Sequence, residues 1–244
     1  MNLLTMEHII KSYTDRRLLD DVGFSISGRE KIGVIGVNGM GKSTLLKIAA
    51  GIESADSGKV SMGNQVKVCY LPQTPVFGEG MTVLEAALMG SGGSVDGFAA
   101  EAEAKSMLNR LGFADYGEKV EHMSGGQKKR AALIGALLSP ADILILDEPT
   151  NHLDSEMSEW LEEYLIRFRG AILMVTHDRY FLDRVASRIV EVDRGKLYSY
   201  PGNYSEFVRL KSERQNTELT AERKRKSLLR TELKWLNRGA RARS

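Results

Sequence analysis

Residues 36–43 read GVNGMGKS and fit the pattern G-x-x-x-x-G-K-[ST]. The apolar residues before them predict a buried strand and those after them predict a helix, the setting in which this pattern holds phosphate groups. Glycines let successive backbone N–H groups converge on an anion, and the N-terminal end of the helix adds positive charge. We expect Lys42 to reach the β- and γ-phosphates of a nucleotide, Ser43 to ligate Mg²⁺ and Thr44 to bond the α-phosphate. The expected nucleotide-binding residues of this loop are Gly36, Asn38, Gly39, Gly41, Lys42, Ser43 and Thr44.

Two adjacent carboxylates, Asp147 and Glu148, follow the apolar run at residues 143–146. An acid at the carboxyl end of a buried strand beside a phosphate loop is placed to hold Mg²⁺, and its neighbour can act as a general base for the attacking water. Adjacent side chains of a strand point to opposite faces, so both can serve one site only if the strand ends between them. Pro149 favours such an end. The alternative is a pair of solvated acids at the end of a strand.

The elements that position these residues alternate between strands and helices. Near-continuous apolar runs in the strands predict a largely parallel sheet that is covered on both faces. A small helical insert is expected at about 74–135, with helical patterns at 83–88 and 98–111. Strands are expected at residues 3–11, 22–27, 59–61, 66–71, 143–146, 171–175, 189–192 and 196–200. The predicted division is a domain at 1–202 and a basic helical extension at 203–244.

The net charge of +2 hides an asymmetry along the chain. Residues 211–244 hold eleven Lys and Arg against four Glu, a charge of +7, so residues 1–210 carry −5. An acidic domain with a basic appendage suggests a polyanionic partner for the appendage, and a solvated helix face is the alternative. The sequence contains no apolar run of about 18 residues, the length that a membrane-spanning helix needs. The single cysteine, Cys69, excludes an internal disulfide and favours a reducing cytoplasm.

Four further segments resemble the motifs of one known family, the ATP-binding cassettes. Residues 123–130, MSGGQKKR, open a helix before the carboxylates and resemble the family's signature sequence, whose first position is more often Leu. Residues 176–178, THD, resemble the segment of the switch histidine, and residues 70–73, YLPQ, the segment that ends in the switch glutamine. Residues 151–154, NHLD, resemble the loop that crosses to the partner cassette.

The resemblance extends over residues 1 to about 200 and implies a fold and an assembly. The fold is α/β: a P-loop NTPase with a mainly parallel sheet, an N-terminal antiparallel β subdomain and a small helical insert. The assembly is a head-to-tail dimer that hydrolyses Mg-ATP, in which the signature helix of one cassette closes over the ATP of the other. The implied residues are Glu148, His177 and Gln73 for catalysis, Ser43, Gln73 and Asp147 for the metal, Ser124, Gly125, Gly126 and Gln127 for the signature, and Asp154 for the dimer loop.

Each of these segments has a plainer interpretation when it is taken alone. The Ser-Gly-Gly sequence at 124–126 is also an ordinary helix cap, and His177 is also a satisfied histidine at the end of a strand. Gln73 follows a turn-forming proline and would then be a surface residue. Tyr13 is expected to stack on the adenine, and a packed core tyrosine is the alternative. The occurrence of the motifs in one order favours the functional interpretation for the signature and His177.

Three features resemble the ABC-F subfamily of soluble, translation-associated tandem cassettes rather than transporter subunits. They are the runs at 148–154, EPTNHLD, and 177–183, HDRYFLD, and the segment YPGNYSEF at 200–207 followed by a basic helix with ELKWLNRG at 232–239. This resemblance implies a ribosome-associated translation factor or an antibiotic-resistance protein. Its implied partners are the ribosome, rRNA and tRNA, bound by the basic tail, which would begin an inter-cassette linker.

Two departures from the subfamily pattern matter. The chain carries one set of motifs, so we interpret it as the first cassette of a longer protein or a shortened form, and a second cassette or a copy of the chain would complete its site. The long helical arm of many members is absent between Gln73 and Ser124. The alternative functions are the ATPase subunit of a membrane transporter, and a cassette that holds ATP without turnover.

Overall fold

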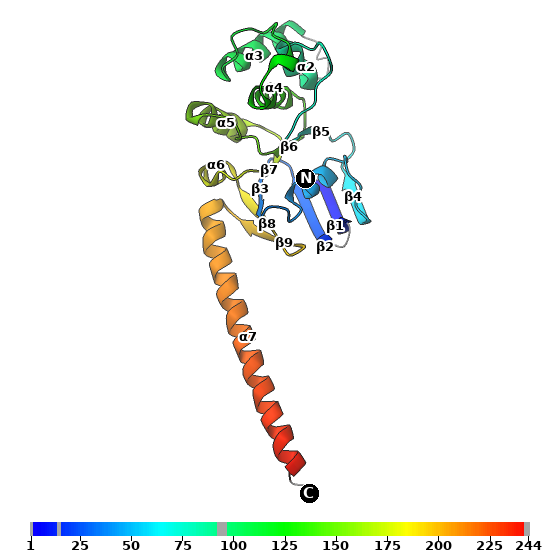
Figure 1. The fold of residues 1–244 in the computed structure, drawn as a ribbon, viewed down its shortest axis with the longest axis vertical. Coiled ribbons are helices and arrows are strands. Elements are labelled where there is room, and N and C mark those ends of the chain that lie inside the picture. Colours follow the sequence, from blue (N-terminus) through cyan, green and yellow to red (C-terminus); the bar gives the residue numbers. More distant parts are fainter. Residues whose placement is uncertain (1, 14–15, 92–96, 242–244) are drawn as a thin grey trace. The chain divides into compact units, whose positions relative to one another are not determined.

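A computed structural model describes residues 2–13, 16–91 and 97–241 and divides the chain into two units, which meet after Tyr204. The first unit holds all the sheets of the described residues and the shorter helices (Figure 1). The second unit is formed by the remainder of α7 (Tyr204–Arg241), the long charged helix that was expected from about residue 203. The side chains of 232 and 234–239, in the expected linker motif, lie outside the described residues, as do residues 242–244.

The larger sheet of the first unit has the strand order β5-β6-β7-β3-β8-β9. All neighbours pair in parallel except β8 and β9, which are antiparallel, so the predicted mainly parallel sheet is confirmed. Every residue of β6 and β7 is buried, as expected for strands that are covered on both faces. The bounds are β3 (Lys31–Gly36), β5 (Val68–Leu71), β6 (Ile143–Asp147), β7 (Ala171–Val175), β8 (Arg188–Asp193) and β9 (Lys196–Pro201).

The smaller sheet is antiparallel and confirms the expected N-terminal β subdomain. Its order is β2-β1-β4, with β1 (Asn2–Tyr13) paired to both β2 (Arg16–Ser27) and β4 (Ser57–Met62). Apolar side chains from this sheet join the same core cluster as those of β3 and α1 (Lys42–Ala49). The strands expected at 3–11 and 22–27 were too short: pairing continues along polar residues at the ends of β1, and in β2 it continues back to Arg16 through the apolar Leu18 and Leu19.

The helical insert contains α2 (Val83–Leu88), α3 (Gly97–Arg110) and α4 (Gly125–Leu137), with one-turn helices at Met89–Ser91 and Val120–His122. A capping box begins α2: the Thr82 side chain accepts from the backbone N–H of Glu85, and the Glu85 carboxylate accepts from the Thr82 backbone. Gly90 lies against Gly135 of α4 so closely that a Cβ at Gly90 would be 1.7 Å from the Gly135 carbonyl oxygen. Two glycines therefore permit the close backbone contact here.

Two further helices, α5 (Ser155–Arg167) and α6 (Arg179–Val185), follow β6 and β7 respectively. Each begins at an aspartate cap: the Asp154 carboxylate accepts from Met157 N at 2.9 Å, and that of Asp178 accepts from two backbone N–H groups of α6 at 3.0 Å. Across residues 2–13, 16–91 and 97–241, no helix is both long and apolar enough to cross a membrane.

Candidate functional site

The loop between β3 and α1 is shaped by glycines in conformations that other residues rarely adopt. Gly36 has φ +148°, and a Cβ there would lie 2.5 Å from the Val192 carbonyl oxygen. Gly41 has φ +99° and caps α1 in a left-handed conformation, against Leu18 of β2. These two positions let the chain turn sharply from the buried strand into the helix. The N-terminus of α1, with its free backbone N–H groups, is thereby directed at the pocket.

Lys42 is the first residue of α1, and its ammonium group is held by the loop itself. Its side chain is largely buried, and Nζ donates to Gly36 O at 2.9 Å, Val37 O at 3.3 Å and Asn38 Oδ1 at 3.2 Å. Burial lowers the pKa of Lys42, although the nearby carboxylates oppose this shift. The result is a positive charge fixed beside the loop, where the terminal phosphates of a nucleotide were expected.

The strand β6 ends at Asp147, so the prediction that the strand ends between the two carboxylates is confirmed. Glu148 then adopts φ +54°, in the left-handed region, and its N–H donates to Val175 O at 2.8 Å. A residue other than glycine is uncommon in this region, because its backbone is strained there. Such strain is often found at functional sites. The turn brings both carboxylates to the same pocket, with Asp147 2% and Glu148 5% exposed.

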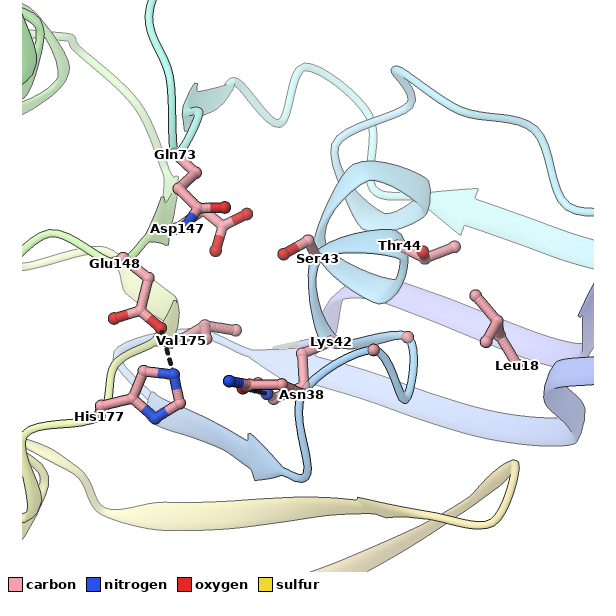
Figure 2. A pocket seen from close by; sticks show the side chains of 12 residues that line it. Leu18, Asn38, Lys42, Ser43, Thr44, Gln73, Asp147, Glu148, Val175 and His177 are labelled. Carbon is pink, nitrogen blue, oxygen red and sulfur yellow. Dashed lines mark hydrogen bonds and ion pairs between the residues drawn. The ribbon is translucent and has the colours of Figure 1, made fainter. Parts of the chain in front are cut away.

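His177 contacts Glu148 at the mouth of the site. His177 Nε2 lies 3.3 Å from Glu148 Oε1, and the histidine side chain is 64% exposed while that of Glu148 is 6% exposed (Figure 2). Burial raises the pKa of Glu148; His177 lowers it and the charge of Asp147 raises it further. The hydroxyl of Thr176, the residue before His177, lies 2.7 Å from the hydroxyl of Thr150, and this hydrogen bond helps to fix the position of the segment that carries His177.

These residues enclose a hollow of about 310 Å³. Figure 2 shows Gln73 and Asp147 on one side of it and Ser43 and Lys42 of α1 on the other. Leu18, which sequence reasoning missed, supplies an apolar wall from β2. The predicted residues that line the hollow are Asn38, Gly39, Gly41, Lys42, Ser43, Thr44, Gln73, Asp147, Glu148 and His177.

The donors in the hollow fit a hard cation such as Mg²⁺. Asp147 Oδ1 and Glu148 Oε2 are buried and have no hydrogen-bond partner in the described part of the chain. The Ser43 hydroxyl and the Gln73 amide supply further oxygens, the ligand type that Mg²⁺ prefers. Among the described residues no group of three or more His, Cys, Asp or Glu could hold a metal.

Tyr13 lies outside the set of described residues that line the hollow. It ends β1, is 46% exposed, and its hydroxyl donates to the Glu53 carboxylate, which raises the pKa of the phenol. Lys11 Nζ lies 5.5 Å from the centre of the ring. The alternative of a packed core tyrosine is wrong, because the ring is too exposed, and stacking on adenine stays a prediction.

The predicted signature residues form an open helix tip, away from the hollow. Ser124 caps α4 through a capping box in which its Oγ accepts from Gln127 N at 3.3 Å and Gln127 Oε1 accepts from Ser124 N at 2.9 Å. A Cβ at Gly125 would meet nothing within 4 Å, whereas one at Gly126 would lie 3.0 Å from the His152 side chain. The tip thus presents exposed N–H groups of a helix N-terminus. Asp154, in the predicted dimer loop, is also exposed and caps α5.

Sequence reasoning also missed Lys129, although it lies within the quoted signature segment. The run Lys128-Lys129-Arg130 is typical of a solvated helix face, yet Lys129 is 3% exposed. Its Nζ donates to Pro72 O at 2.5 Å and to Asp147 O at 2.6 Å, and burial lowers its pKa to about 8. Helical spacing was the available signal, since Lys129 shares the buried face of Leu133 and Ala136.

The chain is similar in sequence to known protein families and to curated proteins. A family profile described as ABC transporter matches residues 19–151, and a second profile with the same description matches residues 190–244. The chain is 44% identical to the ABC transporter ATP-binding protein YfmR of Bacillus subtilis, over 100% of this chain and 44% of that protein. It is 37% identical to the energy-dependent translational throttle protein EttA of Mycobacterium tuberculosis, over 99% of this chain and 50% of that protein. The chain thus spans about half the length of these curated relatives.

Solved structures with the same fold include an ATP-binding subunit of an ABC transporter, with a TM-score of 0.73 and 25% identity over 82% of this chain and 90% of that chain. A dimeric ATP-binding cassette with bound ADP and Pi matches with a TM-score of 0.72 and 22% identity, over 82% of this chain and 98% of that chain. The α/β P-loop fold expected from the sequence is therefore confirmed.

Proposed function

The chain belongs to the ATP-binding cassette family, and on that premise we propose that it binds Mg-ATP in the hollow beside α1 and hydrolyses it when a second cassette closes the site. One observation carries the proposal. A buried ammonium group at the N-terminus of a helix and two buried carboxylates with unpartnered oxygens line the same hollow. Positive charge for phosphates and oxygen ligands for a cation are thus present together.

In this proposal the loop and α1 hold the nucleotide. The N–H groups at the start of α1 face the phosphates. Lys42 Nζ leaves the loop carbonyl oxygens to which it donates and bonds the β- and γ-phosphate oxygens instead. Thr44 bonds the α-phosphate, while Ser43, Gln73 and Asp147 hold Mg²⁺. When bound, the cation would neutralise charge that develops on the phosphate oxygens.

Glu148 is proposed as the general base that takes a proton from the attacking water. Its raised pKa strengthens it as a base relative to an exposed carboxylate, and the ionised form must be present to accept the proton. His177, 3.3 Å from Oε1, orients the carboxylate and faces the position of the γ-phosphate. Catalysis then consists of positioning and electrostatic stabilisation, as is usual for phosphoryl transfer.

The site requires a second cassette, from the same polypeptide or a second copy of the chain. The tip formed by the exposed Ser124 and Gly125 and the half-buried Gly126 lies outside the set that lines its own hollow, and we propose that it caps the γ-phosphate of a facing cassette. Gln127 supports this tip through the capping box, and Asp154 lies in the loop proposed to cross the interface. The test is ATP turnover by the protein together with a second cassette, which should fall by roughly 10²-fold or more with Glu148→Gln.

We further propose that the chain works in translation, as an ABC-F type cassette in the cytoplasm. Support comes from the EttA relatives, which are named as translational throttle proteins, and from the basic sequence of α7. A helix rich in Lys and Arg suits the phosphates of ribosomal RNA or tRNA. Cosedimentation with ribosomes tests this proposal.

A transporter subunit is the second candidate function. It is favoured by an apolar hollow of about 260 Å³ between β5 and the helical insert, lined by Leu71, Pro72, Phe77, Met89 and Ala132 among others. Such a surface suits an apolar element of a membrane permease. Copurification with a membrane protein, without cosedimentation with ribosomes, would favour this function.

A further inference from the structure

Lys129 joins the signature helix to two segments of the nucleotide site within the same cassette. It lies in the second turn of α4, and its ammonium group reaches one carbonyl before Gln73 and another at the end of β6. The distances, 2.5 Å to Pro72 O and 2.6 Å to Asp147 O, are those of strong, charge-assisted hydrogen bonds. Only 3% of the surface of Lys129 is exposed, so water cannot take the place of these two carbonyl oxygens as hydrogen-bond acceptors.

The carbonyl of Asp147 belongs to the peptide group that leads into Glu148. A peptide group is planar, so fixing its oxygen also fixes the direction of the Glu148 N–H. That N–H donates to Val175 O at 2.8 Å, which means that the peptide is held at both ends. The left-handed conformation of Glu148, φ +54°, is strained and persists only where its surroundings enforce it. Lys129 provides one of the two bonds that enforce it.

The carbonyl of Pro72 has the same relation to Gln73. Its peptide group leads into Gln73, whose side chain lines the hollow together with that of Asp147. One ammonium group thus fixes the backbone of two of the three proposed metal ligands, Gln73 and Asp147. Its charge also lies near the two buried carboxylates, as shown by their opposing effect on its pKa.

We infer that Lys129 is a positioning residue that sets the backbone of Asp147, Glu148 and Gln73 for cation binding and water activation. The inference rests on the proposed function of the hollow. Lys129 is not among the residues that line the hollow and would act through the residues that do. A matched control exists in Lys31, which is 8% exposed and whose Nζ donates to two backbone carbonyls, Phe168 O at 2.6 Å and Gly170 O at 3.0 Å. Lys31 lies outside the set that lines the hollow.

The experiment compares Lys129→Met with Lys31→Met in the protein together with a second cassette, from the same polypeptide or a second copy of the chain. The affinity of Mn²⁺ for the complex with a non-hydrolysable ATP analogue is measured by electron paramagnetic resonance, alongside kcat and thermal stability. Both variants should lose stability. Only Lys129→Met should also weaken Mn²⁺ binding and lower kcat, each by roughly 10- to 100-fold, the usual size of effects from residues that support metal ligands. Lys129→Gln, whose amide can still donate to one carbonyl, should show a smaller change in the same direction.

A folded Lys129 variant with the parent's Mn²⁺ affinity and kcat would overturn the inference. Loss of folding in both Lys129 variants would also overturn it, in favour of a purely structural role. Failure of the proposed function has a different signature: the parent protein itself would neither bind the Mn²⁺–nucleotide complex nor turn over ATP.

Discussion

Nε2 of His177 lies 3.3 Å from Oε1 of Glu148, and the two side chains differ sharply in exposure, 64% against 6%. The carboxylate is buried at the end of β6, whereas the imidazole comes from the segment after β7 and remains accessible. This arrangement leaves the histidine able to contact a ligand that enters the hollow while it still touches the proposed base. On the proposed function, a histidine placed in this way would report the presence of a γ-phosphate to Glu148.

Replacing Glu148 with Gln should separate binding from turnover. The amide keeps the size of the side chain but cannot accept a proton, so kcat should fall by roughly 10²-fold or more while ATP affinity is retained. Steady-state phosphate release and equilibrium binding measure the two quantities. Glu163→Gln, on the exposed face of α5, is the control and should keep the parent's rate. Unchanged turnover in Glu148→Gln would remove Glu148 from the role of base.

Replacing Lys42 with Met should instead abolish tight nucleotide binding. A hydrogen bond to a charged group contributes about 1.5–3 kcal/mol, which corresponds to a loss of affinity of roughly 10- to 100-fold. Calorimetry with a non-hydrolysable ATP analogue checks this, with Lys47→Met, near the other end of α1, as the control. Equal affinities in the Lys42 variant and the parent would contradict the assignment of the phosphate site.

Lys31 should make the stability of the fold depend on pH in the alkaline range. Burial lowers its pKa from 10.5 to about 8 in the folded state, so between these values the unfolded chain binds more protons than the folded one. The free energy of unfolding should therefore rise with pH across the window from about 8 to 10.5 through this group. Urea titrations of the parent and Lys31→Met should show a smaller rise in the variant. Lys59→Met, at an exposed position of β4, should leave the rise unchanged, and identical profiles for the parent and Lys31→Met would refute the prediction.

The basic helix α7 should bind polyanions in a salt-dependent way. Replacing Arg223, Lys224 and Arg225 with Gln removes three exposed charges. For every phosphate that the variant no longer neutralises, the slope of log K against log salt should become less negative by about 0.7–0.9. Cosedimentation with ribosomes between about 50 and 200 mM salt measures the slope. The same substitution at Lys59, Lys67 and Lys105 removes equal charge from the cassette and should leave the slope intact. A flat salt response of the parent protein would count against the proposed partner.

Local sequence patterns predicted much of the site because its main parts follow strands. The glycine spacing identified the loop, and Pro149 after two acids indicated where β6 ends, which the structure confirms. Apolar runs in the sequence located the buried strands of the larger sheet, because strands that are covered on both faces consist almost entirely of apolar residues.

Interactions between distant segments were not predictable in the same way. Lys129 meets Pro72, 57 residues away, and although helical spacing places it on the buried face of α4, its carbonyl partners cannot be inferred from the sequence around it. Leu18 reaches the hollow through the pairing of β2, far from the loop it covers. The Tyr13 hydroxyl donates a hydrogen bond to Glu53, 40 residues further along the chain, and this bond could not be inferred from either segment alone.

The central claim is that ATP lies between the loop of one cassette and the signature tip of another, and the structure of the Glu148→Gln protein with Mg-ATP tests it most directly. We expect a γ-phosphate within hydrogen-bond distance of Lys42 Nζ from one cassette and of the Ser124 hydroxyl from the facing cassette. A structure with ATP bound but Ser124 remote from every γ-phosphate, in each assembly observed, would contradict it.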